Sequence, residues 1–187
     1  GQTADAYSNL SARIKIATGD GAAFDTAFKS VFDIAQRTGT AVEDVGSLFT
    51  KLAQAGKQFN LSSAAALQVT ESIAQAAQLS GASVESTTAA YTQFAQAISS
   101  GVLAGDELRS VLENSPRLAL ALADGLGITT GKLRELGAAG ALTATQVIGA
   151  LQGQSAALQK EFEQLPPTIG RAITSLWNNW TAYVGQV

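Results

Sequence analysis

Residues 39–52 read GTAVEDVGSLFTKL. Gly39 can adopt the left-handed backbone that ends a helix, and Thr40 and Glu43 have the spacing of a capping box that opens the next one. The apolar residues that follow recur every three or four positions and therefore share one helical face: Val42, Val45, Leu48, Phe49 and Leu52. This order of stop, cap and apolar stripe predicts two helices joined by a short turn.

The same signals recur before and after this stretch. A short helical pattern covers residues 4–16. Further along, a long helix should run from about Ser62 to Gly81, and Ser83 should cap the next one. Because short connections favour antiparallel neighbours, residues 1–100 are predicted to form one half of a multi-helix bundle.

The helices become shorter after Gly101. Three are expected in this region, at residues 106–113, 115–125 and 130–136. Ser115 should cap the second of them, with Pro116 in its first turn. The pattern predicts a short-helix subregion around residues 101–143.

Two longer helices should complete the chain. Thr143 and Gln146 form another capping-box pattern, and the helix that they open should end at Pro166. Trp177 and Trp180 share a face of the final helix, and packing in the core is favoured over an exposed surface for a partner. We expect residues 101–187 to pack with the first half as one continuous domain. Since the last helix has no stop signal and the first residue is not Met, the chain is interpreted as a fragment of a longer protein.

The composition agrees with an all-α fold and excludes several kinds of site. Hydrophobic residues make up 46% of the 187 residues but aromatic residues only 6%, so the core must be mostly aliphatic, as helix packing favours. With no Cys and no His, the chain can form neither a disulfide nor a zinc site built on those residues, and it lacks an imidazole or thiolate for catalysis. No apolar run approaches the roughly 18 residues of a membrane span.

The surface charge leaves two interpretations open. The chain carries 12 basic and 15 acidic residues, a net charge of −3, which argues against electrostatic binding of nucleic acid. Charged residues are sparse at 14%, so the helix surfaces must be rich in small and uncharged polar side chains. Such a surface can face solvent, or it can lie against another protein with little desolvation cost.

Carboxylates are the remaining route to catalysis, and a helical enzyme with an unrecognised carboxylate site is one alternative function. Asp106 and Glu107 fall in the first turn of a predicted helix, where the helix dipole favours negative charge. Glu161 and Glu163 flank Phe162 and should point to solvent. These positions favour structural roles, so we expect no enzyme activity, no cofactor and no metal.

Residues 115–136 resemble a DNA-binding helix-turn-helix, which is the other alternative. An apolar helix, a turn at Gly127 and a second helix give the right outline. The second helix offers only Lys132 and Arg134 for base contacts, however, with Glu135 beside them. A structural corner is therefore favoured over a DNA-binding adaptor.

Within this region the sequence predicts several structural roles. Gly105 and Gly127 should occupy helix ends that need a permissive backbone, and Arg109 should pair with Glu113, four residues later on the same helix. The buried centre should consist of leucines: Leu108, Leu112, Leu118, Leu122, Leu126 and Leu133.

Residues 101–143 also resemble the signature of phage tail tape-measure proteins. The resemblance is carried by GVLAGDELR at 101–109, continues through SVLENSPRLA at 110–119 and LGIT at 126–129, and extends more weakly over most of the chain. The signature positions are Gly101, Leu103, Gly105, Glu107, Leu108, Arg109, Pro116, Leu126, Gly127, Leu133 and Thr143. At 138–141 the chain reads AAGA, where the family pattern carries more charge.

The resemblance implies a scaffold and not a catalyst. Tape-measure proteins occupy the tail lumen, fix the length of the tail, and leave ahead of the DNA at infection. The implied partners are tail-tube and tail-tip proteins and tail-assembly chaperones, and self-association stays open; no small-molecule substrate and no specific nucleic-acid site are implied. The implied location is the tail lumen of the virion, and the host cytoplasm during assembly.

Overall fold

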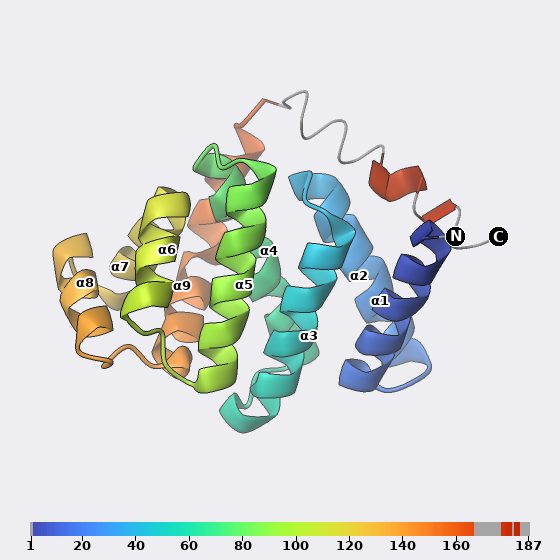
Figure 1. Cartoon of the computed structure of the whole chain (residues 1–187), viewed down its shortest axis with the longest axis horizontal. Helices are drawn as coiled ribbons and strands as arrows, with labels where there is room; N and C mark the ends of the chain where they lie inside the picture. Colours follow the sequence, from blue (N-terminus) through green and yellow to red (C-terminus); the bar gives the residue numbers. More distant parts are fainter. Residues whose placement is uncertain (1, 167–176, 181, 184–187) are drawn as a thin grey trace. The chain divides into compact units, whose positions relative to one another are not determined.

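The computed structural model describes residues 2–166, 177–180 and 182–183, and within these residues the fold is built from α-helices. In chain order they are α1 (Gln2–Thr18), α2 (Ala22–Thr38), α3 (Val42–Phe59), α4 (Ser63–Leu79), α5 (Val84–Ser100), α6 (Gly105–Asn114), α7 (Pro116–Leu126), α8 (Thr130–Ala138) and α9 (Ala144–Glu163) (Figure 1). Residues 177–180 and 182–183 are also helical. The predicted all-α fold is confirmed.

The chain divides into two compact units. The first consists of Gly1–Leu67 with Pro166–Val187, and the second of Gln68–Leu165. This division differs from the boundary expected at residue 100. The reason is that α5 packs on α6 and that the backbone at Val102 pairs with the backbone at Thr143. A boundary after α5 would therefore separate segments that are in contact.

In the first unit, α1, α2 and α3 pack against one another (Figure 1). The stripe predicted from residues 42–52 forms the buried face of α3 and is confirmed. The Leu10 side chain of α1 fills the space that a β-carbon at Gly46 of α3 would need. Because Gly46 has no side chain, the two helices can approach closely.

The turn between α2 and α3 differs from the prediction. Gly39 ends α2 with a φ of 66°, as expected, but the N-cap of α3 is Ala41 and the capping box of Thr40 and Glu43 does not form. The buried Thr40 hydroxyl instead lies 2.8 Å from the hydroxyl of Thr38. The helix begins one residue later than expected because this hydroxyl faces the core and not the first turn of α3.

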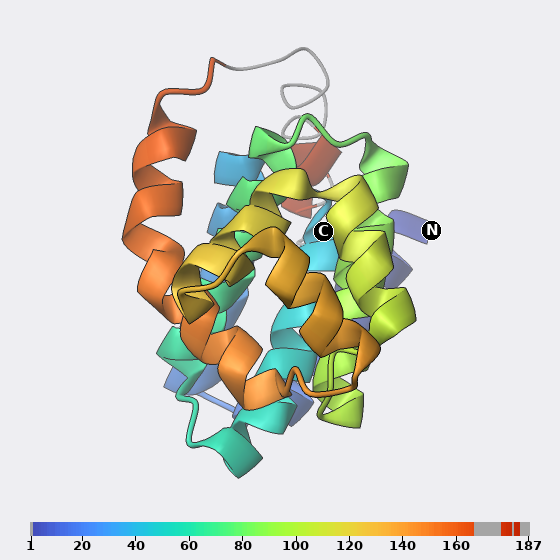
Figure 2. The same cartoon turned by 90° about the vertical axis from the view of Figure 1, so that its left-hand side faces the viewer.

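The second unit contains α5 to α9 and most of α4. Helix α6 packs against α5, α7 and α8, and α7 also packs against α8 and α9 (Figures 1 and 2). Two predicted caps are confirmed: the Ser83 hydroxyl accepts a hydrogen bond from the Ser86 N–H, and Thr143 with Gln146 forms the complete capping box at the start of α9. These local signals fix where α5 and α9 begin.

Ser115 does not cap α7 as predicted. Ser115 is both the C-cap of α6 and the N-cap of α7, with a φ of −141° and a ψ of 74°. Its side chain accepts no cap hydrogen bond. Its buried hydroxyl has no hydrogen-bond partner in the described structure. Pro116 is the first residue of α7, as expected. Because this one residue connects two helices directly, its backbone cannot take the conformation of an ordinary N-cap.

The predicted leucine centre is confirmed in four of its six members. Leu108, Leu118, Leu122 and Leu133 are buried, whereas Leu112 and Leu126 are half-buried. The two exceptions are the third-last residue of α6 and the last residue of α7.

The prediction that the tryptophans lie in the core is wrong. Trp177 and Trp180 are 51% and 54% exposed, and the Trp180 ring packs on that of Tyr183 with 5.8 Å between centroids. Asn178 is the fully buried residue of this segment. Since one helical residue turns the chain by about 100°, burying position 178 directs positions 177 and 180 outward. The rest of the predicted final helix, at 167–176 and 184–187, lies outside the described residues.

Candidate functional site

The two ends of the 101–143 region are joined by main-chain hydrogen bonds. Gly101 ends α5 with a φ of 85°, a conformation that favours glycine. The N–H of Leu103 donates to the carbonyl of Leu142 at 2.8 Å, and the N–H of Ala144 donates to the carbonyl of Gly101 at 2.8 Å. The Leu103 side chain is fully buried. Signature residues at opposite ends of the region, Gly101, Leu103 and Thr143, therefore meet at one place.

Helix α6 places its carboxylates at its amino end. Asp106 and Glu107 lie in the first turn, as predicted, where the backbone N–H groups and the helix dipole stabilise negative charge. No group of three or more carboxylates that could hold a metal ion occurs within the described residues. The geometry of this helix end accounts for both acidic residues without a catalytic role.

The contact between α6 and α8 depends on a glycine. The Leu108 side chain lies against Gly137 and fills the space that a β-carbon there would need. Leu133, one turn earlier on α8, is also fully buried. The signature positions Leu108 and Leu133 thus serve to hold α8 on α6.

The contact between α7 and α9 brings a glycine against the backbone of the neighbouring helix. A β-carbon at Gly125 would lie 2.5 Å from the carbonyl oxygen of Ala150, so only glycine fits here. Near the other end of α7, Arg117 donates from Nε and Nη2 to the two carboxylate oxygens of Glu161 at 2.7 and 3.1 Å. This two-point pair holds the pKa of Glu161 below its ordinary value, chiefly through the hydrogen bond from Arg117.

The predicted glycine roles are confirmed at Gly127 and wrong at Gly105. Gly127 ends α7 with a φ of 69°, in the left-handed region. Gly105 is the first residue of α6, and its φ does not fall in that region. Gly101 supplies the left-handed turn before α6, so Gly105 is left with ordinary helical backbone.

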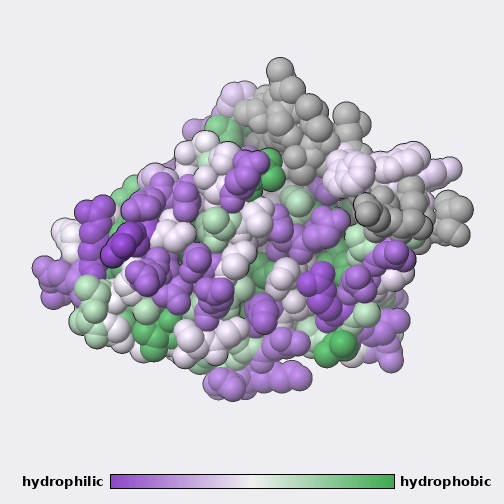
Figure 3. Space-filling model, viewed as in Figure 1, coloured by the Kyte–Doolittle hydropathy of each residue, from purple (hydrophilic) through white to green (hydrophobic). Residues whose placement is uncertain are grey.

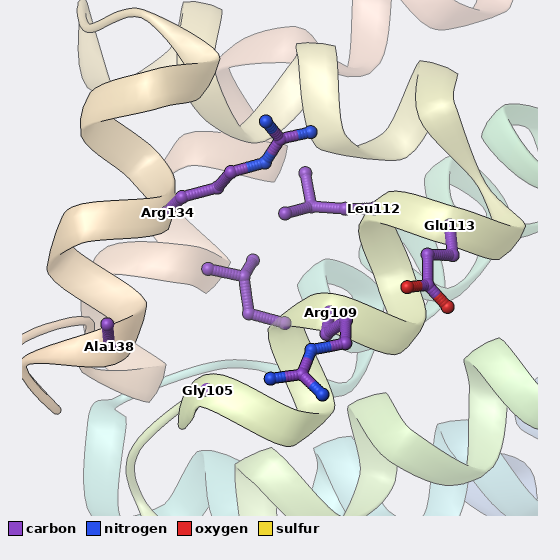
Figure 4. A pocket seen from close by; sticks show the side chains of 7 residues that line it. Gly105, Arg109, Leu112, Glu113, Arg134 and Ala138 are labelled. Atoms are coloured by element: carbon purple, nitrogen blue, oxygen red, sulfur yellow. The ribbon is translucent and has the colours of Figure 1, made fainter.

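A cavity of about 340 Å³ lies between α6 and α8. Its lining comprises Gly105, Leu108, Arg109, Leu112, Glu113, Arg134 and Ala138 (Figure 4). Arg134 extends from α8 over the cavity on the side of Leu112, while Arg109 lies with Gly105 on the other side. The predicted pair between Arg109 and Glu113 does not form: neither takes part in an ion pair in the described part of the chain. Both side chains are exposed, where pairing gains little.

The helix-turn-helix-like corner consists of α7 and α8. On α8, Lys132 pairs with Glu135 at 3.3 Å, and Arg134 lines the cavity against α6. Asp124 is exposed on α7 close to the turn. Neither cation of α8 is therefore presented with a set of polar side chains for reading bases, and the geometry gives no support to the DNA-binding alternative.

The role of Gly125 and the pairing of Arg117 with Glu161 were missed in the sequence. Gly125 lies inside a helical pattern, and an interior glycine in a helix could have indicated a close helix contact. Arg117 and Glu161 are 44 residues apart, and no local signal joins them.

Among the described residues, the face shown in Figure 3 carries no extended apolar patch. Hydrophilic side chains are interspersed there with weakly polar and apolar ones. No helix in the described part of the chain is long and apolar enough to cross a membrane.

Taken together, glycine-dependent helix contacts, a region closed on itself by main-chain hydrogen bonds, and carboxylates at helix ends define a helical packing module. The model of the tape measure protein family matches residues 1–187, the whole chain. The chain belongs to the tape measure protein family, whose members are components of phage tails. Comparison with curated proteins and with solved structures gives no match.

Proposed function

We propose that this chain is an assembly and packing domain of a phage tail tape-measure protein and that it has no catalytic activity. In this role it helps to set the length of the tail tube, lies in the tail lumen of the virion, and leaves ahead of the DNA. Its partners are tail-tube and tail-tip proteins and, in the host cytoplasm during assembly, tail-assembly chaperones. The observation that carries the proposal is the family match over all 187 residues.

Two features of the chain support a packing role. Its helices make close contacts through Gly46, Gly125 and Gly137, which suits a rigid module. Asp106 and Glu107 lie at a helix end and Glu161 is held in an ion pair. Among the described residues that line the cavity between α6 and α8, Glu113 is the one carboxylate, so no two carboxylates share that cavity.

The fold also bears on how such a domain would measure length. As one continuous helix, the 43 residues 101–143 would span about 65 Å, at a rise of about 1.5 Å per residue. In the folded unit the ends of this region are joined by the hydrogen bond from Ala144 to Gly101. If this fold persists in the tail, residues 101–143 therefore contribute almost nothing to the length that the chain spans along the tube.

The test is an in-frame deletion of residues 101–143 in the phage, with tail number, tail length and infectivity measured. If the domain acts in assembly, tails should become fewer or defective while immunoblots show the shortened chain at a normal level. Tails shorter by about 65 Å would mean that the region is extended in the tube, and a much smaller change would mean that it is folded there. Tails of normal number, length and infectivity would refute the assembly role.

A further inference from the structure

The cavity between α6 and α8 combines an apolar floor with a charged rim. Leu108 is buried at its base and Leu112 is half-buried, whereas Arg109, Glu113 and Arg134 are exposed. The cavity is therefore open to solvent between two helices. Its volume of about 340 Å³ falls at the lower end of the range of ligand sites, roughly 300–1,000 Å³.

The two arginines are notable because the surrounding unit is acidic. Residues 68–165 contain nine acidic and five basic side chains. Of the five basic residues, Arg117 and Lys132 pair with carboxylates, whereas Arg109, Arg134 and Lys160 have no such partner among the described residues. Both unpaired arginines line the same cavity, Arg134 on the side of Leu112 and Arg109 on the side of Gly105 (Figure 4).

A guanidinium group binds a carboxylate with directed, charge-assisted hydrogen bonds. Two such groups on opposite sides of a cavity that leucines also line fit a ligand whose carboxylates flank an apolar stretch. One face of an amphipathic helix has this arrangement, because residues three or four apart lie side by side. A groove between two helices is a common seat for such a helix.

We infer that the cavity between α6 and α8 binds an acidic amphipathic helix of a partner protein, with Arg109 and Arg134 holding its carboxylates and Leu108 and Leu112 contacting its apolar side chains. A phosphate backbone fits less well, since Glu113 lines the same cavity and the unit carries an excess of negative charge. The inference rests on the proposed function, because that function makes the partner a protein of the tail or of tail assembly.

The test measures binding of a fluorescent helical peptide of about 15 residues to the 187-residue chain by anisotropy. The peptide has the pattern Glu-x-x-Leu-x-x-x-Leu-x-x-Glu, which aligns both carboxylates and both leucines on one face. Two control peptides replace the glutamates by glutamine or the leucines by alanine. The variants are Arg109→Gln, Arg134→Gln and the double variant, with Lys132→Gln as the matched control on α8 that does not line the cavity.

We expect saturable binding that is weakened about tenfold by each cavity arginine substitution and unchanged by Lys132→Gln. Both control peptides should bind about tenfold or more weakly. A peptide with lysines in place of the glutamates should bind Arg109→Glu/Arg134→Glu better than the unaltered chain, which tests charge pairing without dependence on stability.

Three results would overturn the inference. One is the absence of saturable binding, another is equal binding of the glutamine peptide, and the third is full competition by inorganic phosphate or a short DNA duplex at concentrations near that of the peptide. Because the binding test uses purified chain, its failure leaves the deletion test of the assembly role unaffected, and normal tails from the deletion leave the binding result standing.

Discussion

Asn178 supplies the hydrogen bonds of a cap to a helix that begins 136 residues before it. Its Oδ1 accepts from the N–H of Val42 at 3.3 Å, and its Nδ2 donates to the carbonyl of Thr40 at 2.8 Å. Val42 is the first residue of α3, whose own N-cap, Ala41, has no side-chain acceptor. A residue from the end of the chain thus satisfies one of the free N–H groups at the start of α3.

Replacing Asn178 by alanine should destabilise the first unit by about 1–3 kcal/mol, because it leaves a buried N–H and a buried carbonyl without partners. Hydrogen exchange at the Val42 amide should accelerate together with a fall in the midpoint of thermal unfolding. Asn179→Ala is the matched control: its side chain bonds to Gln36 at an exposed position, so its effect should be much smaller. Equal effects of the two substitutions would argue against the cap.

Gly125→Ala should destabilise the second unit by about 1–3 kcal/mol, because the new β-carbon would meet the backbone of Ala150, which cannot rotate away. Gly153→Ala, on α9 with open space around it, should instead stabilise by about 0.5–1 kcal/mol through helix propensity. Chemical denaturation of both variants provides the measurement. A Gly125→Ala protein as stable as Gly153→Ala would show that α7 and α9 are not in close contact.

Gly127→Ala should cost about 1 kcal/mol, because residue 127 must adopt a left-handed backbone that alanine disfavours. A β-carbon there meets no other atom within 4 Å, so the cost comes from the backbone and not from a clash. Gly105→Ala should be neutral or stabilising, since that residue has ordinary helical backbone. The comparison uses thermal unfolding of the two variants, and an inverted order of stability would contradict these backbone assignments.

Glu161→Gln should lower stability at neutral pH by at most about 1 kcal/mol, because solvent screens an ion pair whose acidic side chain is 49% exposed. Arg117 lowers the pKa of Glu161 in the folded state, so the contribution is present above the ordinary carboxyl value of about 4.3 and is lost as the pH falls through the lowered pKa. The free energy of unfolding of the Glu161→Gln variant should therefore fall less between pH 7 and pH 3 than that of the unaltered chain. Glu163→Gln, which removes no ion pair with Arg117, is the control; if both variants keep the full pH dependence, the pair does not contribute.

Much of this fold could be predicted because its signals are local. A stripe such as Val45, Leu48 and Leu52 is set by the helical repeat alone, and the Thr143 box with Gln146 is complete within four residues. The glycine stops at Gly39 and Gly127 depend only on which residue tolerates a left-handed backbone. For these features the sequence contains both partners of each interaction.

Other features depend on residues that only folding brings together. Thr40 looked like a cap, but Asn178, 138 residues later, took part in the turn instead. The pair of Arg109 with Glu113 was expected from helical spacing, yet the ion pair that forms with two hydrogen bonds joins Arg117 to Glu161 across α7 and α9. By itself the sequence determined where helices begin and end and which face of each helix is apolar, because these features depend on residues close together in the chain. The tertiary structure decided which polar groups meet and where two arginines are left beside a cavity, because hydrogen bonds between helices depend on distances that no local pattern encodes.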